Sequence, residues 1–494
     1  MENKKIIVVG GGVTGLAIAC LLKRQLPREL VDIKLIDDTR GDKVFSETTH
    51  SAIHNFHDLI GLDEKVCMLD RDTTFNLGLL YKNWSFPSQE FILSEGTYGA
   101  PLGGADFKDI FAKCKNLDGS YCFDDYSINA AAAKYNRFGH PSSDLKSIYS
   151  SIKYGLNFYT DSYAKTLKKN AINLGVEIYN ANCISVDVSK INGNIDSIKL
   201  SNDDILSADL FVDCSGDASV LLGDALGVDD IEDELSQLFG KSVSGYCGSV
   251  SRVKSAATVE QGRYGYLKRI PLKHGETVSY VFDDGLVSSD VIENDMLAYG
   301  VNEVKFFTES VKRKRSFWVK NCVAIGDSAL SFNDLYLSPQ YIARNSIVRF
   351  LDLLVDFDSY EQSRYEYNRL SVMEYDHIKE ILELHFYLAK DNSHIINEYF
   401  LNKNLSDSAH HRLELFNVMG RYAQSDAELM SESSWIAFFM GNGVVPKNHN
   451  FFADKIDIKK IISHTEKLKN FIHKSVENIP KQEDYVAQIA ASKN

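Results

Sequence analysis

The sequence predicts a mixed α/β fold of the Rossmann type, with a second lobe and a helical C-terminal region. Two observations near the N-terminus predict its core. The β-branched run 6–9 leads into a glycine-rich turn at 10–15, which is the strand, turn and helix start that binds a dinucleotide. A second strand at 31–37 ends in Asp37, about twenty residues past the last glycine. This is the spacing of a carboxylate that binds a ribose hydroxyl, and an ordinary βα turn does not explain it.

The residues of the glycine turn have different structural roles. Gly10 permits the tight turn, Gly12 lets backbone N–H groups approach a pyrophosphate, and Gly15 lets the following helix pack close to the strand. Val13 and Thr14 lie between these glycines and are expected to bind the same phosphates through their backbone. All five residues are therefore predicted to contact the cofactor.

Composition and charge exclude several classes of protein. The chain has 494 residues, enough for two or three lobes, and 44% of them are hydrophobic. Its net charge of -14 argues against a nucleic-acid surface. The eight cysteines lack the spacing of metal ligands, so no disulfide and no metal site is predicted. With no leader and no membrane-spanning run recognised, we expect a cytoplasmic protein that does not enter the membrane.

Local patterns predict the elements that follow. The polar segment 45–51 is expected to form a loop beside the cofactor. Apolar spacing predicts a helix at 52–62, and residues 74–81 resemble a strand. The aromatic-rich region 83–153 shows no clean period, which suits an irregular lobe that covers a pocket. Its aromatic residues could equally be packing residues.

Further along the chain, a helix at 162–173 is predicted to end at Gly175, and a strand at 176–179 follows. A hairpin turn is predicted at 192–193. The strand 210–213 ends in Asp213 and leads into Gly216, which is a second approach of the backbone to the cofactor.

A third approach identifies the cofactor. The apolar strand that begins at residue 322 ends in Gly326 and Asp327, about 300 residues beyond the glycine turn. This pattern resembles the GR2 or p-hydroxybenzoate hydroxylase type of FAD-binding fold, in which the aspartate contacts the ribityl chain. Asp327 would also suit the N-cap of a helix. No second glycine motif exists for a nicotinamide cofactor, so we expect reduced FAD to come from a separate flavin reductase.

Several motifs together resemble the flavin-dependent halogenases, especially the tryptophan halogenases, over nearly the whole chain. Segment 46–49 resembles their flavin loop, which makes Glu47 and Thr49 expected cofactor-binding residues. Segment 210–216 resembles their Asp-Cys-Ser-Gly motif, which adds Asp213 and Gly216. The remaining matches are 75–78 with 83–84, 270–272 with His274, and the C-terminal segments 367–370, 384–386 and 434–446.

The resemblance implies a chemistry. In this family reduced FAD, O2 and a halide give hypohalous acid, which travels through a tunnel to the substrate. A lysine there receives or orients the oxidant, and a glutamate beside the substrate assists substitution on an electron-rich ring.

This sequence departs from the family at its catalytic positions. Asn76 stands where the lysine is expected, and its amide can donate a hydrogen bond to hypohalous acid. Tyr336 falls at the glutamate, and Lys268 falls on one of two family tryptophans. We take Asn76, Tyr336 and Lys268 as the candidate catalytic residues. Lys82 is placed on the strand of Asn76, and a solvated surface charge is the alternative interpretation of both lysines.

Two enzyme hypotheses and one alternative remain. The first is a divergent halogenase that acts on a small aromatic substrate such as an indole or a phenol, free or bound to a carrier. The second is a flavin monooxygenase or oxidase on the same scaffold. The third is a flavin-binding protein without activity, which the intact cofactor motifs disfavour.

The expected organisation follows from these segments. Residues 1–50, 154–225 and 300–350 are predicted to form an interleaved FAD-binding module. Residues 51–153 and 226–299 would form the substrate-facing lobe, and 351–494 a mainly helical C-terminal region. Apolar residues recur at heptad-like spacing in 365–390, which suits either packing on the sheet domain or a homodimer surface.

Overall fold

The computed structural model describes residues 3–27, 29–37, 45–68, 72–248, 253–357, 360–422, 424 and 428–491. Its first sheet has the strand order β20-β21-β12-β1-β2-β8, and all neighbours run parallel except β20 and β21. Ile6, Ile7, Val8 and Val9 are completely buried, as expected for a parallel strand covered on both faces. The strands are β1 (Lys4–Val9), β2 (Val31–Ile36), β8 (Glu177–Tyr179), β12 (Leu210–Asp213), β20 (Trp318–Val319) and β21 (Cys322–Ala324).

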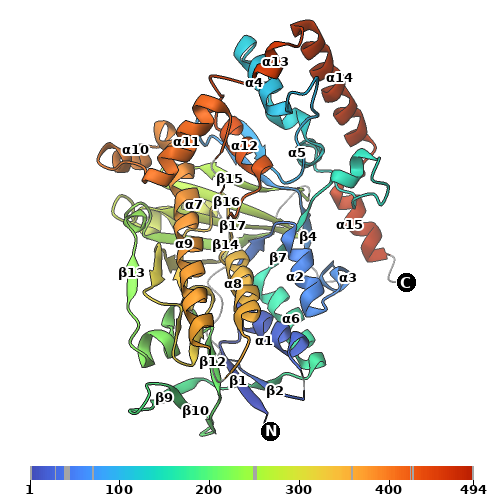
Figure 1. Ribbon diagram of the computed structural model, residues 1–494. Helices are drawn as coiled ribbons and strands as arrows, with labels where there is room; N and C mark the ends of the chain where they lie inside the picture. Colours follow the sequence, from blue (N-terminus) through green and yellow to red (C-terminus); the bar gives the residue numbers. More distant parts are fainter. Residues whose placement is uncertain are drawn as a thin grey trace.

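Helices pack against this sheet. The predicted helix after the glycine turn is α1 (Val13–Gln25), which confirms the prediction. It lies beside α6 (Thr160–Leu174) and α8 (Pro339–Leu353) (Figure 1). The predicted end of α6 is also confirmed, because Gly175 adopts the left-handed conformation of a C-cap, with φ +86°.

Two small sheets lie beside the parallel sheet. The predicted hairpin is confirmed, with β9 (Cys183–Val188) and β10 (Ile195–Leu200) pairing antiparallel across the turn. β11 (Ile205–Leu206) extends this hairpin. The other small sheet has the order β13-β19-β22, formed by β13 (Asp230–Glu232), β19 (Lys312–Lys314) and β22 (Leu330–Ser331).

The second large sheet has seven strands in the order β18-β14-β17-β16-β15-β5-β6. Every neighbouring pair is antiparallel except β15 with β5. In Figure 1 its yellow-green strands run across the view behind α8 and α9. The strands are β5 (Leu79–Lys82), β6 (Glu90–Leu93), β14 (Lys241–Cys247), β15 (Ala257–Gln261), β16 (Gly265–Leu272), β17 (Gly275–Phe282) and β18 (Val304–Thr308), and α7 (Ser289–Ala298) packs on β17.

A three-stranded sheet joins the two large ones. β7 (Gly155–Tyr159) pairs with β3 (Ser46–Thr48) on one edge and with β4 (Thr74–Asn76) on the other. β16 of the seven-stranded sheet also contacts β3 and β7. This arrangement brings the end of the predicted flavin loop beside Asn76.

The prediction of one strand over 74–81 is wrong. The chain turns at Gly78, whose φ of +154° and lack of a Cβ allow close contact, since a Cβ there would lie 2.6 Å from the carbonyl oxygen of Leu93. β4 and β5 therefore belong to different sheets. Lys82 does not share a strand with Asn76, and it forms an exposed ion pair with Glu90.

The region predicted as an irregular lobe contains regular elements as well as loops. Trp84 is 1% exposed and its indole N–H donates to the backbone oxygen of His385, so this aromatic residue is a packing residue. The helices of this region and of the preceding segment are α2 (Ala52–Ile60), α3 (Glu64–Met68), α4 (Phe107–Leu117) and α5 (Ile128–Lys134).

The C-terminal part is helical. Ile378, Ile381 and Leu384 of the long helix α9 are buried in the core of the chain itself, which confirms packing for these members of the heptad-like pattern. Figure 1 shows α4, α13 and α14 together at the top of the view. The helices are α9 (Glu361–Ala389), α10 (His394–Leu401), α11 (Asp407–Met419), α12 (Glu432–Gly441), α13 (Phe451–Asp454), α14 (Ile458–Glu477) and α15 (Gln482–Ala491).

Candidate active site

The glycine turn is as tight as the sequence requires. Gly10 has φ +124°, and a Cβ there would lie 2.0 Å from the carbonyl oxygen of Cys214. A Cβ on Gly15 would lie 1.8 Å from the carbonyl oxygen of Gly10. Both positions therefore exclude larger residues, and α1 packs directly against the turn.

The N-terminus of α1 fits an anionic ligand. Its N-cap is Gly12, which offers no side-chain cap, and the first turn beginning at Val13 carries no acidic residue. The positive end of the helix dipole is thus not neutralised by a side chain of that turn. Thr14 is buried, and its hydroxyl donates to Gln340 at the start of α8.

Asp37 lies at the end of β2, next to the glycine turn. A Cβ on Gly11 would lie 1.7 Å from Oδ1 of Asp37, so Gly11 makes room for this carboxylate. Oδ2 of Asp37 accepts a hydrogen bond of 2.5 Å from Lys168 of α6. The side chain remains 19% exposed, so it can meet a ligand while Lys168 holds it in place.

Asp213 is used within the protein. Its Oδ1 accepts hydrogen bonds from the backbone and hydroxyl of Ser215, and its Oδ2 accepts from the backbone N–H groups of Leu221 and Leu222. The residue has no exposed surface, and this burial raises the pKa of its carboxyl against the effect of the hydrogen bonds. These hydrogen bonds shape the turn that contains Gly216, whose φ is +69°.

Gly326 and Asp327 bring a third segment to the glycine turn. Gly326 has φ +77°, and a Cβ there would lie 3.1 Å from the hydroxyl of Thr14. Asp327 is half-buried at the start of a short helical turn, and it lines a cavity together with Lys268 and Asp334. Segments near residues 10, 213 and 326 thus converge, which is the arrangement of a dinucleotide-binding site.

Glu47 is held by an ion pair. Both of its carboxylate oxygens accept from the guanidinium of Arg344, at 2.5 and 3.2 Å, and Ser338 donates to Oε1 at 2.7 Å. Although burial opposes its charge, Arg344 has a raised pKa because Glu47 stabilises the cation. The pair fixes the predicted flavin loop to α8.

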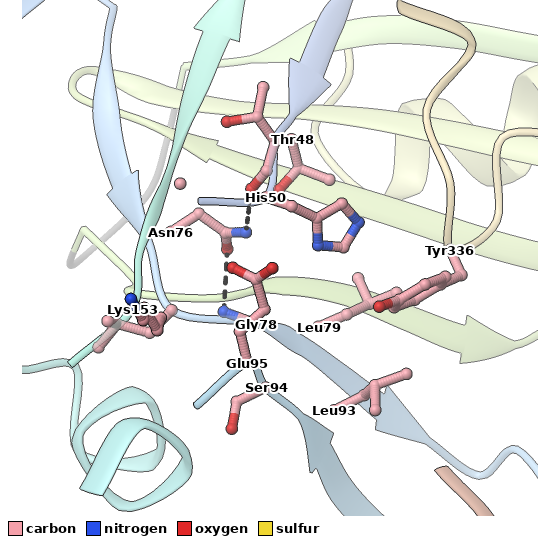
Figure 2. Close-up of a pocket in the computed structure, with 13 residues that line it drawn as sticks. Thr48, His50, Asn76, Gly78, Leu79, Leu93, Ser94, Glu95, Lys153 and Tyr336 are labelled. Carbon is pink, nitrogen blue, oxygen red and sulfur yellow. Dashed lines mark hydrogen bonds between the residues drawn. The ribbon is translucent and has the colours of Figure 1, made fainter. Parts of the chain in front are cut away.

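A cavity lies beyond this loop (Figure 2). Thr48 and Asn76 face it, and within the described part of the chain the Thr48 hydroxyl has no hydrogen-bond partner although it is buried. Such an atom marks a place where a ligand can bind. The full lining is Thr48, Thr49, His50, Asn76, Leu77, Gly78, Leu79, Leu93, Ser94, Glu95, Lys153, Gly155 and Tyr336.

Asn76 links the backbone of three segments. Its amide donates to the carbonyl oxygen of Thr49 at 3.1 Å, and its Oδ1 accepts from the N–H groups of Gly78 and Ala257, both at 3.4 Å. The close approach of Thr49 depends on Gly155, where a Cβ would lie 1.9 Å from the Thr49 oxygen. Asn76 therefore lines the cavity and also holds its wall together.

Tyr336 forms another side of the cavity. Its ring centroid lies 4.9 Å from that of His50 and 5.7 Å from that of His385. Burial, together with the nearby Glu95 carboxylate, raises the pKa of the Tyr336 phenol. The phenol therefore stays protonated and can donate a hydrogen bond.

Lys268 lies away from this cavity and is not a surface charge. It is 3% exposed, and its ammonium donates to Asp334 at 2.5 Å in the cavity that also contains Asp327. The interpretation as a solvated surface charge is therefore wrong for Lys268 and correct for Lys82, whose side chain is 35% exposed.

Comparison with known proteins identifies the family. The model of the family described as tryptophan halogenase matches residues 5–457. The chain belongs to the tryptophan halogenase family. It is a flavin-dependent enzyme that uses FAD, and the halogenases of this family receive FAD in reduced form from a separate reductase.

Curated halogenases match at low identity. The 7-chloro-L-tryptophan 6-halogenase KtzR of Kutzneria sp. (strain 744) is 24% identical over 412 residues, which cover 77% of this chain and 78% of KtzR. The tryptophan 6-halogenase SttH of Streptomyces toxytricini is 22% identical over 523 residues and covers 98% of both chains.

A solved structure shares the fold. The flavin-dependent halogenase BrvH from Brevundimonas sp. BAL3 superposes with a TM-score of 0.92 at 23% identity and covers 99% of each chain. The predicted FAD-binding α/β fold with a C-terminal helical region is therefore confirmed. In the part of this halogenase that the structure describes, no helix has the length and apolar character needed to cross a membrane.

Three cavity residues with titratable side chains were not singled out from the sequence of this halogenase. They are His50, Glu95 and Lys153. Glu95 and Lys153 lie in the stretch predicted as an irregular lobe, where no periodicity indicates which side chains point inward. His50 follows the flavin loop directly, and this position was the one available signal.

Proposed function

We propose that this enzyme halogenates an electron-rich aromatic ring, with reduced FAD, O2 and a halide as the other reactants. The observation that carries the proposal is the cavity where the end of the flavin loop, Thr48 and Thr49, meets Asn76. A small oxidant made beside the flavin would reach a substrate through this junction. Membership of the tryptophan halogenase family supports the same reaction.

The glycine turn would form the first part of the cofactor site. Gly10, Gly12, Val13, Thr14 and Gly15 would hold the pyrophosphate at the N-terminus of α1.

The remaining parts of the cofactor would meet other segments. Asp37 would bind the adenosine ribose, and Gly326 with Asp327 would bind the ribityl chain. Thr49 and Gly216 would contact the cofactor through their backbone atoms. Glu47 and Asp213 would act by positioning these segments, since their carboxylates are already bonded to the protein. Bound reduced FAD supplies the two electrons that turn O2 and a halide into hypohalous acid and water.

The residues of the chain then control that oxidant. The Asn76 amide would donate a hydrogen bond to hypohalous acid, and it would position the oxidant without binding it covalently. Leu77, Leu79 and Leu93 form the apolar part of the lining, and Tyr336 can stack on an aromatic ring. The free volume of about 20 Å³ has room for one water, so the lining must move apart when such a ring binds. Lys268 forms an ion pair with Asp334 in the cavity that Asp327 also lines. It would therefore act on the part of the site next to the flavin.

The substrate class rests on the relatives, whose names give tryptophan or 7-chloro-L-tryptophan as substrate. We infer a small indole or phenol. The flavin reductase is the expected protein partner. A homodimer and a cytoplasmic location remain predictions, which light scattering and cell fractionation would test.

One experiment tests the reaction. The protein is incubated with reduced FAD, O2 and either bromide or chloride, together with an indole or a phenol, and the products are read by mass spectrometry. Halogen in place of a ring hydrogen is the expected result. A product with one added oxygen, formed equally well without halide, would instead indicate the monooxygenase and contradict the proposal.

A further inference from the structure

We propose that Glu95 is the catalytic carboxylate that accepts the proton of the substrate ring. This inference rests on the halogenation proposed above and assigns a residue to its last step. The family resemblance places a glutamate beside the ring, and this chain has Tyr336 there. Because the Tyr336 phenol has a raised pKa, it stays protonated and cannot accept that proton.

Glu95 lies in the right cavity. It lies two residues after the end of β6 and lines the cavity together with Asn76 and Tyr336. Figure 2 shows its carboxylate directed toward the Asn76 amide, inside the cavity. Among the described residues that line this space, Glu95 carries the one carboxylate, so no other lining residue can replace it in kind.

The carboxylate is held in place by the start of a helix. Its Oε2 accepts the backbone N–H of Ser51 at 2.8 Å. Ser51 immediately precedes α2, so the positive end of that helix faces the carboxylate and favours its negative charge. The loop is fixed as well, because Asn129 donates its amide to the backbone oxygen of Glu95 at 3.0 Å.

Two other side chains in the cavity must be considered as acceptors of the ring proton. The His50 imidazole lines the same cavity, with its ring 4.9 Å from that of Tyr336. Lys153 also lines it but is exposed to solvent, and as an ammonium ion it has no lone pair for a proton. His50 is therefore the alternative acceptor that an experiment must exclude.

The proposed step replaces one hydrogen of the aromatic ring with halogen. A ring carbon attacks the halogen of hypohalous acid, so a carbon–halogen bond forms and the halogen–oxygen bond breaks with release of hydroxide. The cationic ring then loses its proton to the Glu95 carboxylate, and the electrons of that C–H bond restore the aromatic ring. Glu95 passes the proton to hydroxide, which gives water. An ionised carboxylate also stabilises the cationic ring before the proton leaves.

The test separates oxidant formation from ring substitution. In Glu95→Gln the amide oxygen can still accept from Ser51, so the fold should persist. Hypohalous acid is measured by trapping with a thiol, and the ring product is measured with a substrate carrying hydrogen or deuterium at the reacting carbon. We expect unchanged hypohalous acid, a fall of about 100-fold in ring product, and an isotope effect absent from the wild type. Glu95→Asp should restore part of the rate.

Matched variants complete the test. Glu90→Gln changes an exposed carboxylate on β6, the strand that precedes Glu95, and should behave as wild type. An E95Q enzyme with wild-type ring halogenation and no isotope effect overturns the assignment. The same holds if the isotope effect appears in His50→Gln instead. If the wild type makes no hypohalous acid and no halogenated product, the proposed function itself fails, which the thiol trap shows directly.

Discussion

Arg344 of α8 binds both carboxylate oxygens of Glu47 in the flavin loop, although 297 residues of sequence separate them. The two side chains are 7% and 4% exposed. A charge at this depth is tolerated because its partner is present, and removal of one partner leaves the other uncompensated. The predicted flavin loop therefore depends on a helix that lies far away in the sequence.

Arg344→Met should destabilise the protein and weaken FAD binding. The buried Glu47 would lose its cation, which costs about 3–5 kcal/mol in the free energy of unfolding. Urea unfolding and flavin fluorescence titration measure the two effects. Arg369→Met is the control, since the pair of Arg369 with Glu366 is exposed and should cost at most about 1 kcal/mol. Equal stability of the two variants would contradict the role given to Arg344.

Gly15→Ala should abolish FAD binding. The new Cβ would lie 1.8 Å from the carbonyl oxygen of Gly10, so α1 must move away from the turn that holds the pyrophosphate. Gly119→Ala adds the same methyl group where nothing lies within 4 Å. The flavin content of the purified variants gives the answer, and a G15A protein that retains FAD would disprove the proposed cradle.

Asn76→Lys should raise guided halogenation, measured as the fraction of product in one regioisomer. A lysine at this position supplies the amine that the family uses to orient the oxidant. Both this variant and the control Asn76→Met lose the amide bonds to Thr49, Gly78 and Ala257, so the control isolates the amine. If N76K is folded and loaded with FAD but gives the wild-type product distribution, guidance does not depend on this position.

Lys268→Met should lower the free energy of unfolding by about 3–5 kcal/mol, because Asp334 would keep a buried charge without its cation. Adding Asp334→Asn to the same chain removes that charge and should recover most of the loss. Urea midpoints of the wild type, the single variant and the double variant test this. A double variant no more stable than K268M would show that packing of the lysine, and not its charge, matters.

The stability of the helical region should depend on pH through His377. Burial alone would lower its pKa, but hydrogen bonds and charges from Glu380 and Glu428 raise it above the usual value. The charged His377 therefore stabilises the fold below about pH 6.5, and this contribution is lost as pH rises through the raised pKa.

The measurement compares the wild type with His377→Gln. The difference in urea midpoint should be large near about pH 6 and small near about pH 9. His410→Gln, on the exposed side of α11, should show no such trend. A constant difference for H377Q would mean that the histidine acts by its shape alone.

Local sequence patterns were sufficient to predict the glycine turn and the other segments of the proposed cofactor site. The positions of Gly10, Gly15, Asp37 and Gly326 follow from glycine spacing and from apolar runs, which act over a few residues. The Gly175 cap and the hairpin at 192–193 are equally local. Each of these features can be predicted because the residue itself determines the backbone conformation.

The substrate side could not be predicted in the same way. The burial of Lys268, the ion pair of Arg344 with Glu47 and the position of Glu95 depend on how distant segments pack. The break at Gly78 was missed because apolar residues on both sides continue the strand pattern. Long-range pairing decides these features, and it leaves no periodic signal in one sequence.

The strand order of the parallel sheet has a consequence for protein synthesis. β1 needs β12 on one side, with Ile6 opposite Leu210, and β12 needs β21, with Phe211 opposite Cys322. A nascent chain that has left the ribosome only as far as residue 200 thus carries an apolar strand with one open edge, which invites aggregation. Abundant chaperones, which cover such an edge until residues 210–324 have been made, should therefore raise the yield of folded protein.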